Sequence, residues 1–279
     1  MQYSQALKMG VEELTKADIE NAKWDAQILL EYVTKAEHSY HLSHPDAEVE
    51  EEKVASYKNC IQKRADHIPL QYITGEQDFM GLTFEVSPDV LIPRADTEIL
   101  VEEVLREGMD GERILDMCTG SGCILLSLLK FTNQCFGVGV DISEAALEIA
   151  NKNAKKLEVE GYEFIQSDLF ENVSGVFDCI VSNPPYIESD EINNLMPEVA
   201  KYEPRLALDG KNDGMWFYRR IIGEVNTFLK PGGRVYFEIG YNQGEAVSRL
   251  LEDVGMKEVC IVKDYAGLDR VVKGYKPIL

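Results

Sequence analysis

Residues 113–129 read RILDMCTGSGCILLSLL, and this stretch decides the fold of a chain of 279 residues. Its first part, Arg113–Asp116, has the character of a short strand, and Cys123–Leu129 has that of an apolar helix. The turn between them contains Gly120 and Gly122. Glycine lets the backbone come close to a ligand, and the start of a helix presents free N–H groups. We therefore expect a strand, a turn and a helix that together hold a ligand.

Strand and helix signals alternate from about residue 95 onward. The expected strands are Arg113–Asp116, Cys135–Val140, Tyr162–Ile165, Phe177–Ser182, Arg234–Ile239, Glu258–Val262 and Arg270–Val272. Helices are expected between them, among them Ser143–Lys156 and Gly214–Leu229. Such alternation is typical of an α/β fold with a mainly parallel sheet and helices on both faces.

Polar side chains stand at the ends of the next two strands. Asp141 ends the second strand, where a carboxylate is placed to accept hydrogen bonds from ribose hydroxyls. Gln166-Ser167-Asp168-Leu169 ends the third strand and is able to hold the edge of an adenine. Open α/β sheets bind ligands at the carboxyl ends of their strands, so these residues predict one shared site.

The glycine turn by itself is weak evidence, because many helices begin after a glycine. A dinucleotide-binding turn prefers the spacing G-x-G-x-x-G, whereas this chain has Gly120-Ser121-Gly122 with Cys118 ahead of them. No Gly-Lys-Ser/Thr follows, which argues against a nucleotide-phosphate loop. Together with Asp141, the turn predicts an adenosine-type cofactor that lacks a pyrophosphate.

The fourth strand ends in Asn183-Pro184-Pro185-Tyr186. The Asn carbonyl oxygen accepts hydrogen bonds, a residue before proline is held extended, and proline stiffens the loop while its carbonyl stays an acceptor. Tyr186 adds a flat surface, so the loop suits a planar NH2 group. On these four residues alone, an ordinary proline-rich turn is an equally good interpretation.

The N-terminal part of the chain has a different character. Residues 1–75 are expected to be all-helical, because apolar residues recur there with a period near 3.6. One such set is Trp24, Ile28, Leu29, Tyr32 and Val33. Residues 76–94 predict a β-hairpin linker, with strands at Leu82–Val86 and Val90–Pro93 around the turn Ser87-Pro88-Asp89.

Charge and composition narrow the function. The chain has 28 Lys and Arg against 49 Asp and Glu, a net charge of −21 that repels nucleic acid and attracts a basic protein. The six scattered cysteines form no C-x-x-C pair and there are only four histidines, which predicts free thiols and no metal site. No membrane-spanning run and no secretory signal is evident. We expect a cytoplasmic protein without membrane association.

The motifs named so far resemble class I S-adenosylmethionine-dependent methyltransferases of amino groups. They are Asp116-x-x-Thr119-Gly120-Ser121-Gly122, Asp141, Ser167-Asp168 and Asn183-Pro184-Pro185-Tyr186. Further segments make the chain similar to the PrmC/HemK family, the bacterial methyltransferases of peptide chain release factors. These segments are Pro69–Gly75, Leu91–Arg94, Asp96–Glu98, Tyr202–Arg205, Asp213-Gly214, Asp264-Tyr265 and Asp269-Arg270. The resemblance covers nearly the whole chain.

The resemblance implies a Rossmann-like catalytic domain at residues 95–279, behind a helical substrate-recognition domain at 1–75 and the hairpin linker at 76–94. It implies S-adenosyl-L-methionine as cofactor. The acceptor it implies is the side-chain amide nitrogen, N5, of the Gln in the Gly-Gly-Gln motif of class I peptide chain release factors.

The resemblance also implies roles for individual residues. The cofactor-binding residues are Cys118, Thr119, Gly120, Ser121, Gly122, Asp141, Asp168, Leu169 and Asn183. Within that set, Asp141 holds the ribose, and Asp168 and Leu169 lie near adenine. The substrate-binding residues are Asn183, Pro184, Pro185 and Tyr186, of which Asn183, Pro184 and Tyr186 are catalytic. In this mechanism Asn183 and the Pro184 carbonyl accept the two N–H hydrogens of the substrate amide.

Two departures from the family pattern stand out. Cys118 stands where the family often has glycine, so a side chain has to fit in a tight turn, and Ala95 stands where proline is common. Arg94 and Glu98 have two interpretations, a salt bridge at a helix start or a segment that closes over the cofactor.

Two other functions stay open. A methyltransferase of adenine or guanine amino groups in DNA or RNA has a similar loop, but the charge of −21 and the lack of a Lys/Arg cluster argue against stable nucleic-acid binding. A non-catalytic cofactor-binding adaptor is disfavoured by Asp141 and Asn183. The acidic run Glu48, Glu50, Glu51 and Glu52 is either a solvated surface or a docking surface for the release factor.

Overall fold

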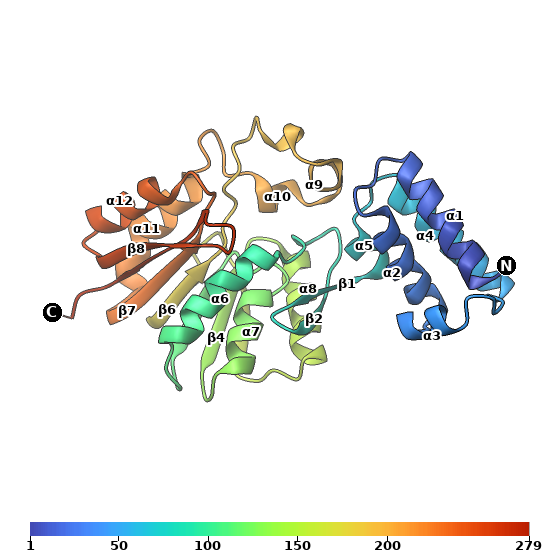
Figure 1. Cartoon of the computed structure of the whole chain (residues 1–279). Helices are drawn as coiled ribbons and strands as arrows, with labels where there is room; N and C mark the ends of the chain where they lie inside the picture. The colour runs from blue at the N-terminus through green and yellow to red at the C-terminus, as the bar shows by residue number, and fades with distance from the viewer. Residues whose placement is uncertain (279) are drawn as a thin grey trace. The chain divides into compact units, whose positions relative to one another are not determined.

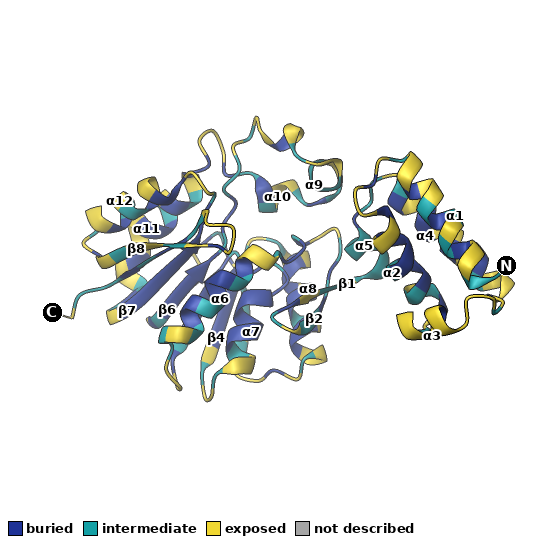
Figure 2. Ribbon diagram, in the orientation of Figure 1, coloured by how far each residue is buried: buried dark blue, intermediate teal, exposed yellow. Residues whose placement is uncertain are grey.

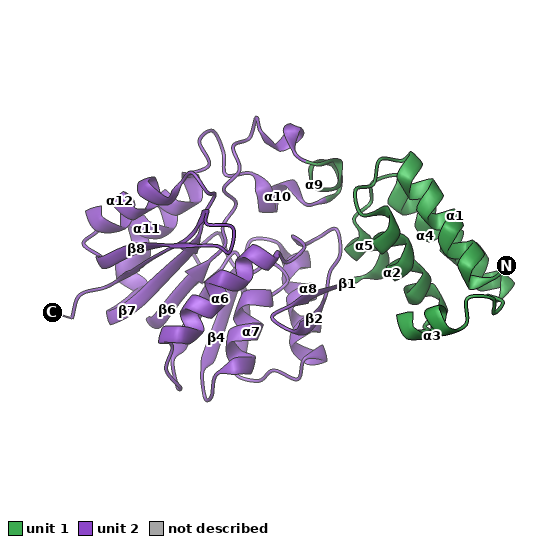
Figure 3. Ribbon diagram, viewed as in Figure 1, with its two compact units in different colours: residues 1–76, 196–202 green, residues 77–195, 203–279 purple. Residues whose placement is uncertain are grey.

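The computed structural model describes residues 1–278 and divides into two compact units (Figures 1 and 3). The first, here called the helical unit, consists of residues 1–76 together with 196–202. The second, here called the sheet unit, consists of the rest of the chain. No helix in the described residues is both long and apolar enough to cross a membrane.

Helices alone build the helical unit. They are α1 (Tyr3–Lys16), α2 (Ala22–Thr34), α3 (His38–Ser43), α4 (Glu51–Ala65), α5 (Leu70–Thr74) and α9 (Pro197–Tyr202). Tyr57 on α4 is fully buried and donates its hydroxyl hydrogen to the carbonyl of Ala26 at 3.0 Å. A Cβ on Gly10 of α1 would lie 2.1 Å from the Tyr57 hydroxyl, so only glycine lets α1 and α4 pack this closely.

The apolar set expected on α2 is divided between core and surface. Leu29 is fully buried, whereas Trp24 is 65% exposed and Tyr32 is 37% exposed. The helix is therefore present where the periodicity predicted it, but two of its aromatic residues lie outside the core.

Residues 196–202 belong to the helical unit through polar contacts with α4 and the residues after it. Glu198 accepts hydrogen bonds from Arg64 at 2.9 Å and lies 3.1 Å from the His67 ring. Tyr202 donates to the carbonyl of Asp66 at 2.7 Å. Because Arg64 also pairs with buried Asp25 at 2.7 Å, the segment is bound to the centre of the helical unit.

The β-hairpin lies one strand earlier than the sequence predicted. Strands β1 (Glu76–Phe79) and β2 (Leu82–Glu85) pair, and Met80-Gly81 form the turn, with φ of 52° and 72°. Positive φ at both central residues is the hairpin turn that matches strand twist. Glu98 accepts a hydrogen bond from the Met80 backbone N–H at 2.6 Å.

The expected return strand at residues 90–93 is wrong, since residues 86–94 contain no strand. The Ser87-Pro88-Asp89 signal was a real bend, but Pro88 and Pro93 lack N–H donors for a ladder. A turn at Met80 carried no such signal, because methionine rarely adopts positive φ.

A seven-stranded sheet is the centre of the sheet unit (Figure 1). Its order is β5 (Tyr162–Gln166), β4 (Phe136–Asp141), β3 (Arg113–Met117), β6 (Phe177–Ser182), β7 (Leu229–Glu238), β9 (Asp269–Tyr275) and β8 (Lys257–Lys263). All neighbours are parallel except β7 with β9 and β9 with β8. The predicted mainly parallel sheet is confirmed, and β7 alone begins well before its expected start.

Helices cover both faces of this sheet, as predicted. The helices are α6 (Ala95–Glu107), α7 (Cys123–Phe131), α8 (Glu144–Lys156), α10 (Arg205–Leu208), α11 (Trp216–Phe228) and α12 (Gly244–Asp253), with a short 3₁₀ turn at Ile192–Asn194. Leu115 and Met117 pack in the cluster with α11 and α12. Ile114 packs in the cluster with α6 and α7. Alternate residues of one strand therefore serve opposite faces, and the strands are buried on both sides (Figure 2).

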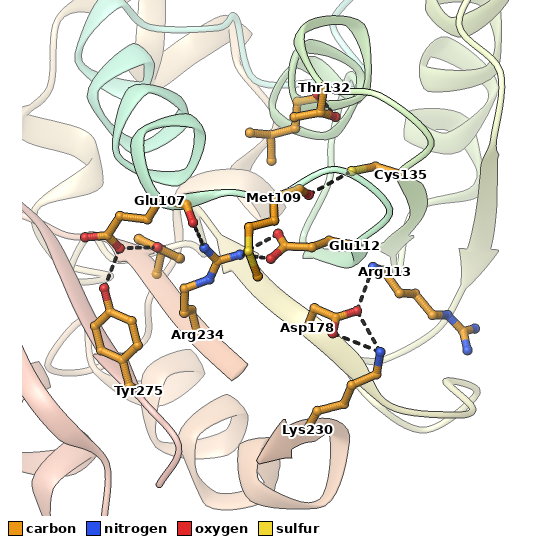
Figure 4. A network of polar contacts seen from close by, with 12 residues as sticks. Glu107, Met109, Glu112, Arg113, Thr132, Cys135, Asp178, Lys230, Arg234 and Tyr275 are labelled. Carbon is orange, nitrogen blue, oxygen red and sulfur yellow. Dashed lines mark hydrogen bonds and ion pairs between the residues drawn. The ribbon is translucent and has the colours of Figure 1, made fainter. Parts of the chain in front are cut away.

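A polar network joins α6 to the strands at the end of the sheet away from their carboxyl ends (Figure 4). The Arg234 guanidinium pairs with the Glu112 carboxylate and donates to the Glu107 carbonyl. The Glu107 carboxylate accepts from the Tyr275 hydroxyl at 2.6 Å. Beside it, Lys230 pairs with Asp178 at 2.7 Å.

This network gives stability a defined pH dependence. Burial raises the pKa of Glu107, but hydrogen bonds from Lys273, Tyr236 and Tyr275 outweigh burial and bring the pKa to about 2. A carboxyl group with a lowered folded-state pKa stabilises the fold above its ordinary pKa and loses that contribution as pH falls. Glu107→Gln should therefore lower the free energy of unfolding by about 1 to 2 kcal/mol at pH 7.

The difference between wild type and Glu107→Gln should shrink between pH 4.5 and about 2. Urea denaturation at several pH values measures it, with exposed Glu252→Gln as the control. A difference that stays constant over this range would contradict the role given to the Glu107 carboxylate.

Candidate functional site

The candidate site is a cavity at the carboxyl ends of β3, β4, β5 and β6. The chain runs from β3 outward through β4 to β5 and then returns to β6 on the other side of β3, so the strand order reverses between β3 and β6. Crevices at such a reversal are where open α/β sheets bind ligands. The cavity has a volume of about 390 Å³ and lies wholly within the sheet unit.

The turn after β3 adopts the conformation that its glycines suggested. Cys118, Gly120 and Gly122 all have positive φ, at 64°, 55° and 78°. The Thr119 hydroxyl donates to Asp116 Oδ2 at 2.6 Å, and the Gly120 N–H donates to Asp141 Oδ2 at 2.9 Å. The turn is thereby fixed to both β3 and β4.

Gly122 has a packing role that differs from that of Gly120. A Cβ on Gly122 would lie 3.1 Å from Leu126 and 3.2 Å from Ala150, so this glycine lets α7 and α8 approach each other. Gly122 does not line the cavity, whereas Cys118, Thr119, Gly120 and Ser121 do.

Asp116 lies at the base of the turn and is fully buried. Burial raises its pKa to about 7, although hydrogen bonds from Thr119 and the Leu125 backbone oppose the shift. Its Oδ1 atom has no hydrogen-bond partner among the described residues. Asp116 therefore supports the turn through Thr119 and does not itself line the cavity.

Asp141 presents a carboxylate at the end of β4. Its Oδ1 accepts the Ser143 N–H at 2.9 Å, and its Oδ2 accepts that of Gly120. Burial raises its pKa, and these backbone donors limit the rise. Each carboxylate oxygen has a second lone pair, so Asp141 keeps capacity to accept from a ligand in the cavity.

Asp168 and Leu169 also line the cavity, at the end of β5. Asp168 pairs with Arg220 at 2.7 Å, and the Arg220 guanidinium lies 4.6 Å from the ring centroid of Trp216. Trp216 and Phe217 at the start of α11 line the same cavity. The sequence did not single out these two aromatic residues, because nothing in the helix pattern distinguishes a core residue from a residue of a cavity wall.

The loop after β6 brings Asn183 and Pro185 to the cavity. Asn183 Nδ2 donates to the Thr97 hydroxyl at 3.3 Å. Pro184 is buried, and neither Pro184 nor Tyr186 is among the residues that line the cavity. Instead the Tyr186 hydroxyl donates to Glu238 Oε1 at 3.4 Å, so its ring forms part of the support of the loop.

Backbone contacts hold this loop from behind. Gln243 donates from Nε2 to the Tyr186 carbonyl at 3.0 Å. Gly214 packs so closely that a Cβ there would lie 2.3 Å from the same carbonyl oxygen. The Gly210 N–H donates to the Ile187 carbonyl at 2.8 Å. The loop is therefore held by Gln243 and by the segment that contains Gly210 and Gly214.

The segment before α6 contributes several residues that the sequence analysis left without a site role. Val90, Leu91 and Pro93 line the cavity, as does Thr97 in the first turn of α6. Arg94 lines it too and pairs with the buried carboxylate of Glu203, which supports the salt-bridge interpretation with a partner distant in sequence. In the sequence, this segment stood out only by its similarity to the family at Leu91–Arg94 and Asp96–Glu98, and not by any periodicity.

No group of three or more His, Cys, Asp or Glu side chains in residues 1–278 is arranged to hold a metal ion. All six cysteines are free.

The sheet order, the turn after β3 and the polar loop after β6 define a methyltransferase of the class I, Rossmann-like type. Residues 94–211 match the model of the methyltransferase small domain, and residues 5–75 match that of the PrmC N-terminal domain. A methyltransferase from Pyrococcus furiosus has a similar fold, with a TM-score of 0.54 at 20% identity over 72% of this chain and 91% of that one.

Curated relatives extend over the full length. The release factor glutamine methyltransferase of Clostridium acetobutylicum is 41% identical over 278 residues, 98% of each chain. That of Clostridium botulinum is 41% identical over 96% of each chain. The chain belongs to the family of release factor glutamine methyltransferases.

The positive φ of Cys118 generates a stability prediction. A Cβ in the left-handed region costs about 1–2 kcal/mol, partly offset by the roughly 0.5–1 kcal/mol that glycine loses in chain entropy. Cys118→Gly should therefore be more stable than Cys118→Ala by about 0.5–1 kcal/mol, since both lose the thiol and only alanine keeps the Cβ. Paired chemical denaturation curves measure the difference. An alanine variant as stable as the glycine variant would contradict the strain.

Proposed function

We propose that this protein transfers a methyl group from S-adenosyl-L-methionine to the side-chain amide nitrogen, N5, of the Gln in the Gly-Gly-Gln motif of class I peptide chain release factors. One observation carries the proposal: Asn183 opens into the same cavity as the turn after β3 and the carboxylate of Asp141. An amide-binding group and a cofactor-binding group therefore border one space.

The residues around the cavity fit S-adenosyl-L-methionine. Asp141 has lone pairs for ribose hydroxyls, and Ser121 and Gly120 expose backbone at the start of α7. The walls near Leu169 and Phe217 are apolar, as an adenine ring requires. When bound, the cofactor supplies an electrophilic methyl group.

The loop after β6 would make the substrate amide reactive. A Gln amide nitrogen is a poor nucleophile because its lone pair is delocalised into the carbonyl. Acceptors on both N–H hydrogens favour a pyramidal nitrogen, and they stabilise the positive charge that develops on it. We assign these acceptors to Asn183 Oδ1 and the Pro184 carbonyl, with Pro185 and Tyr186 fixing the loop. Alignment of the nitrogen with the methyl group would supply the rest of the acceleration.

The helical unit is the proposed recognition surface for the release factor, with residues 76–94 as linker. Glu48, Glu50, Glu51 and Glu52 at the start of α4 are exposed and acidic. A protein that binds ribosomal RNA offers basic surface, so this acidic group is complementary to it. The charge of −21 favours a protein partner over stable nucleic-acid binding. Free cysteines are consistent with a cytoplasmic site of action.

The direct test is methyl transfer. Incubation with radiolabelled S-adenosyl-L-methionine should label a class I release factor and leave unlabelled the same factor in which the Gln of the Gly-Gly-Gln motif is replaced by Ala. Scintillation counting and peptide mapping measure the label. Equal labelling of both factors would overturn the assignment of the acceptor. Transfer of the label to an oligonucleotide would favour a nucleobase substrate.

A pair of variants separates the two halves of the cavity. Asn183→Ala should lower kcat by roughly 100-fold or more, because it removes an acceptor that acts on the reacting nitrogen. Its Kd for S-adenosyl-L-methionine should change little. Asp141→Ala should instead clearly raise the Kd for S-adenosyl-L-methionine and change kcat less. Single-turnover kinetics and calorimetry measure the two quantities. Equal losses in both quantities for Asn183→Ala would contradict its role.

A further inference from the structure

Asn183 has a partner that decides how its amide is turned. The Thr97 hydroxyl, in the first turn of α6, accepts the hydrogen bond from Asn183 Nδ2 at 3.3 Å. Thr97 is only 3% exposed, so water does not compete freely for this contact. Because Nδ2 is held by Thr97, Oδ1 is the atom of the Asn183 amide that remains to serve as an acceptor.

Behind Thr97 lies Glu238, at the end of β7. Its side chain is buried, with the whole residue 1% exposed. The Thr97 hydroxyl lies beside this carboxyl group and lowers its pKa, and the Tyr186 hydroxyl donates to Oε1 at 3.4 Å. The Glu238 backbone carbonyl accepts from the Tyr218 hydroxyl at 2.8 Å. Glu238 is therefore in contact with Tyr186 directly and with Asn183 through Thr97.

Hydrogen-bond direction follows from the donor count. A threonine hydroxyl has one hydrogen and two lone pairs, and an ionised carboxylate has only lone pairs. When the Thr97 hydrogen points to Glu238, the Thr97 lone pairs are left for Asn183 Nδ2. With Glu238 ionised, the order Glu238, Thr97, Asn183 has a single direction, and it ends in an acceptor oxygen at the cavity.

The stability of the fold does not explain Glu238. A buried acid without an ion pair is costly, and burial raises its pKa to about 7, with Thr97, Arg270 and Tyr186 opposing and Asp96 reinforcing the shift. The nearest cation, Arg270, already pairs with Asp96 and Asp264 at 3.0 Å each. Glu238 Oε2 has no hydrogen-bond partner among the described residues. For stability alone, an apolar residue would be favoured at this buried position.

We propose that Thr97 and Glu238 are positioning residues for methyl transfer: they turn the Asn183 amide so that Oδ1, and not Nδ2, meets the substrate amide. The inference rests on the proposed function and deepens it, because it says what makes Asn183 an acceptor. Thr97 and Glu238 do not touch the reacting atoms in this mechanism. They act only through Asn183 and, for Glu238, through Tyr186.

Replacement of Glu238 by Gln should reverse the order of hydrogen bonds. A glutamine amide has two donor hydrogens, and one of them directed at Thr97 would occupy one of its lone pairs and leave the Thr97 hydrogen without the carboxylate as acceptor. The Thr97 hydrogen would then point to Asn183 and stabilise the turned amide, with Nδ2 at the cavity. An N–H donor facing the substrate NH2 group repels it, so the variant would lose the acceptor although Asn183 is still present.

The experiment measures release-factor methylation by three variants, Thr97→Val, Thr97→Ser and Glu238→Gln. Thr97→Val and Glu238→Gln should lower kcat by roughly 10- to 100-fold, as for other misplaced reacting groups. Thr97→Ser keeps the hydroxyl and should recover most of that loss. The Kd for S-adenosyl-L-methionine, from calorimetry, should stay within about threefold in all three, since none of them holds the cofactor.

A control and a double variant separate positioning from general damage. Ser127 on α7 is fully buried, its hydroxyl has no partner in the described residues, and it does not line the cavity. Ser127→Ala should leave kcat unchanged. Thr97→Val should cause no further loss in an Asn183→Ala background, because its effect passes through Asn183.

The outcomes are distinct from failure of the proposed function. If wild-type protein methylates the release factor but Thr97→Val keeps kcat within about threefold of it, the positioning role is wrong and the proposed function stands. A further loss of kcat when Thr97→Val is added to Asn183→Ala also overturns the positioning role. If Thr97→Val does not fold, the kcat of Glu238→Gln is compared with that of Thr97→Ser. Equal values would overturn the positioning role. If wild-type protein transfers no label, the proposed function itself fails.

Discussion

The parallel pairing of β3 with β6 is the constraint on which the site depends. Ile114 through Met117 stand in register with Cys179 through Ser182, and the Ser182 hydroxyl donates to the Met117 carbonyl at 2.6 Å. These two strands are 65 residues apart along the chain at that hydrogen bond. Their pairing places the turn that starts at Cys118 beside the loop that starts at Asn183. The two segments proposed to bind the cofactor and the substrate amide therefore meet because both follow neighbouring strands of one sheet.

Other parts of the sheet unit hold these two segments in place. Asp141 fixes the turn through the Gly120 N–H, and Gln243 fixes the loop through the Tyr186 carbonyl. Burial makes each of these polar contacts worth more than it would be in water, and makes an unpaired group costly. Rigidity of this kind matters for methyl transfer, which depends on alignment of two reacting groups. The buried acid Glu238 is best understood in the same terms.

Local patterns predicted most of the fold, because strand and helix signals act over short distances. Strands β3 and β6 appear within a residue of their expected ends, and α8 begins at the residue after Ser143. The hairpin was placed wrongly, since its turn at Met80 depends on Gly81 and on a hydrogen bond from the backbone of Met80 to Glu98. The inclusion of α9 in the helical unit likewise depends on Arg64, more than a hundred residues away.

The sequence by itself determined the kinds of group available: a glycine turn, a carboxylate at residue 141, and an amide at residue 183 fixed before prolines. It also determined that they follow successive strands, which is enough to predict one shared site. Only the tertiary structure decided which atoms face the cavity. Gly122 packs between helices, Tyr186 is held by Glu238, and Thr97 turns the Asn183 amide. Such orientations arise from contacts between residues distant in the chain, and no local pattern records them.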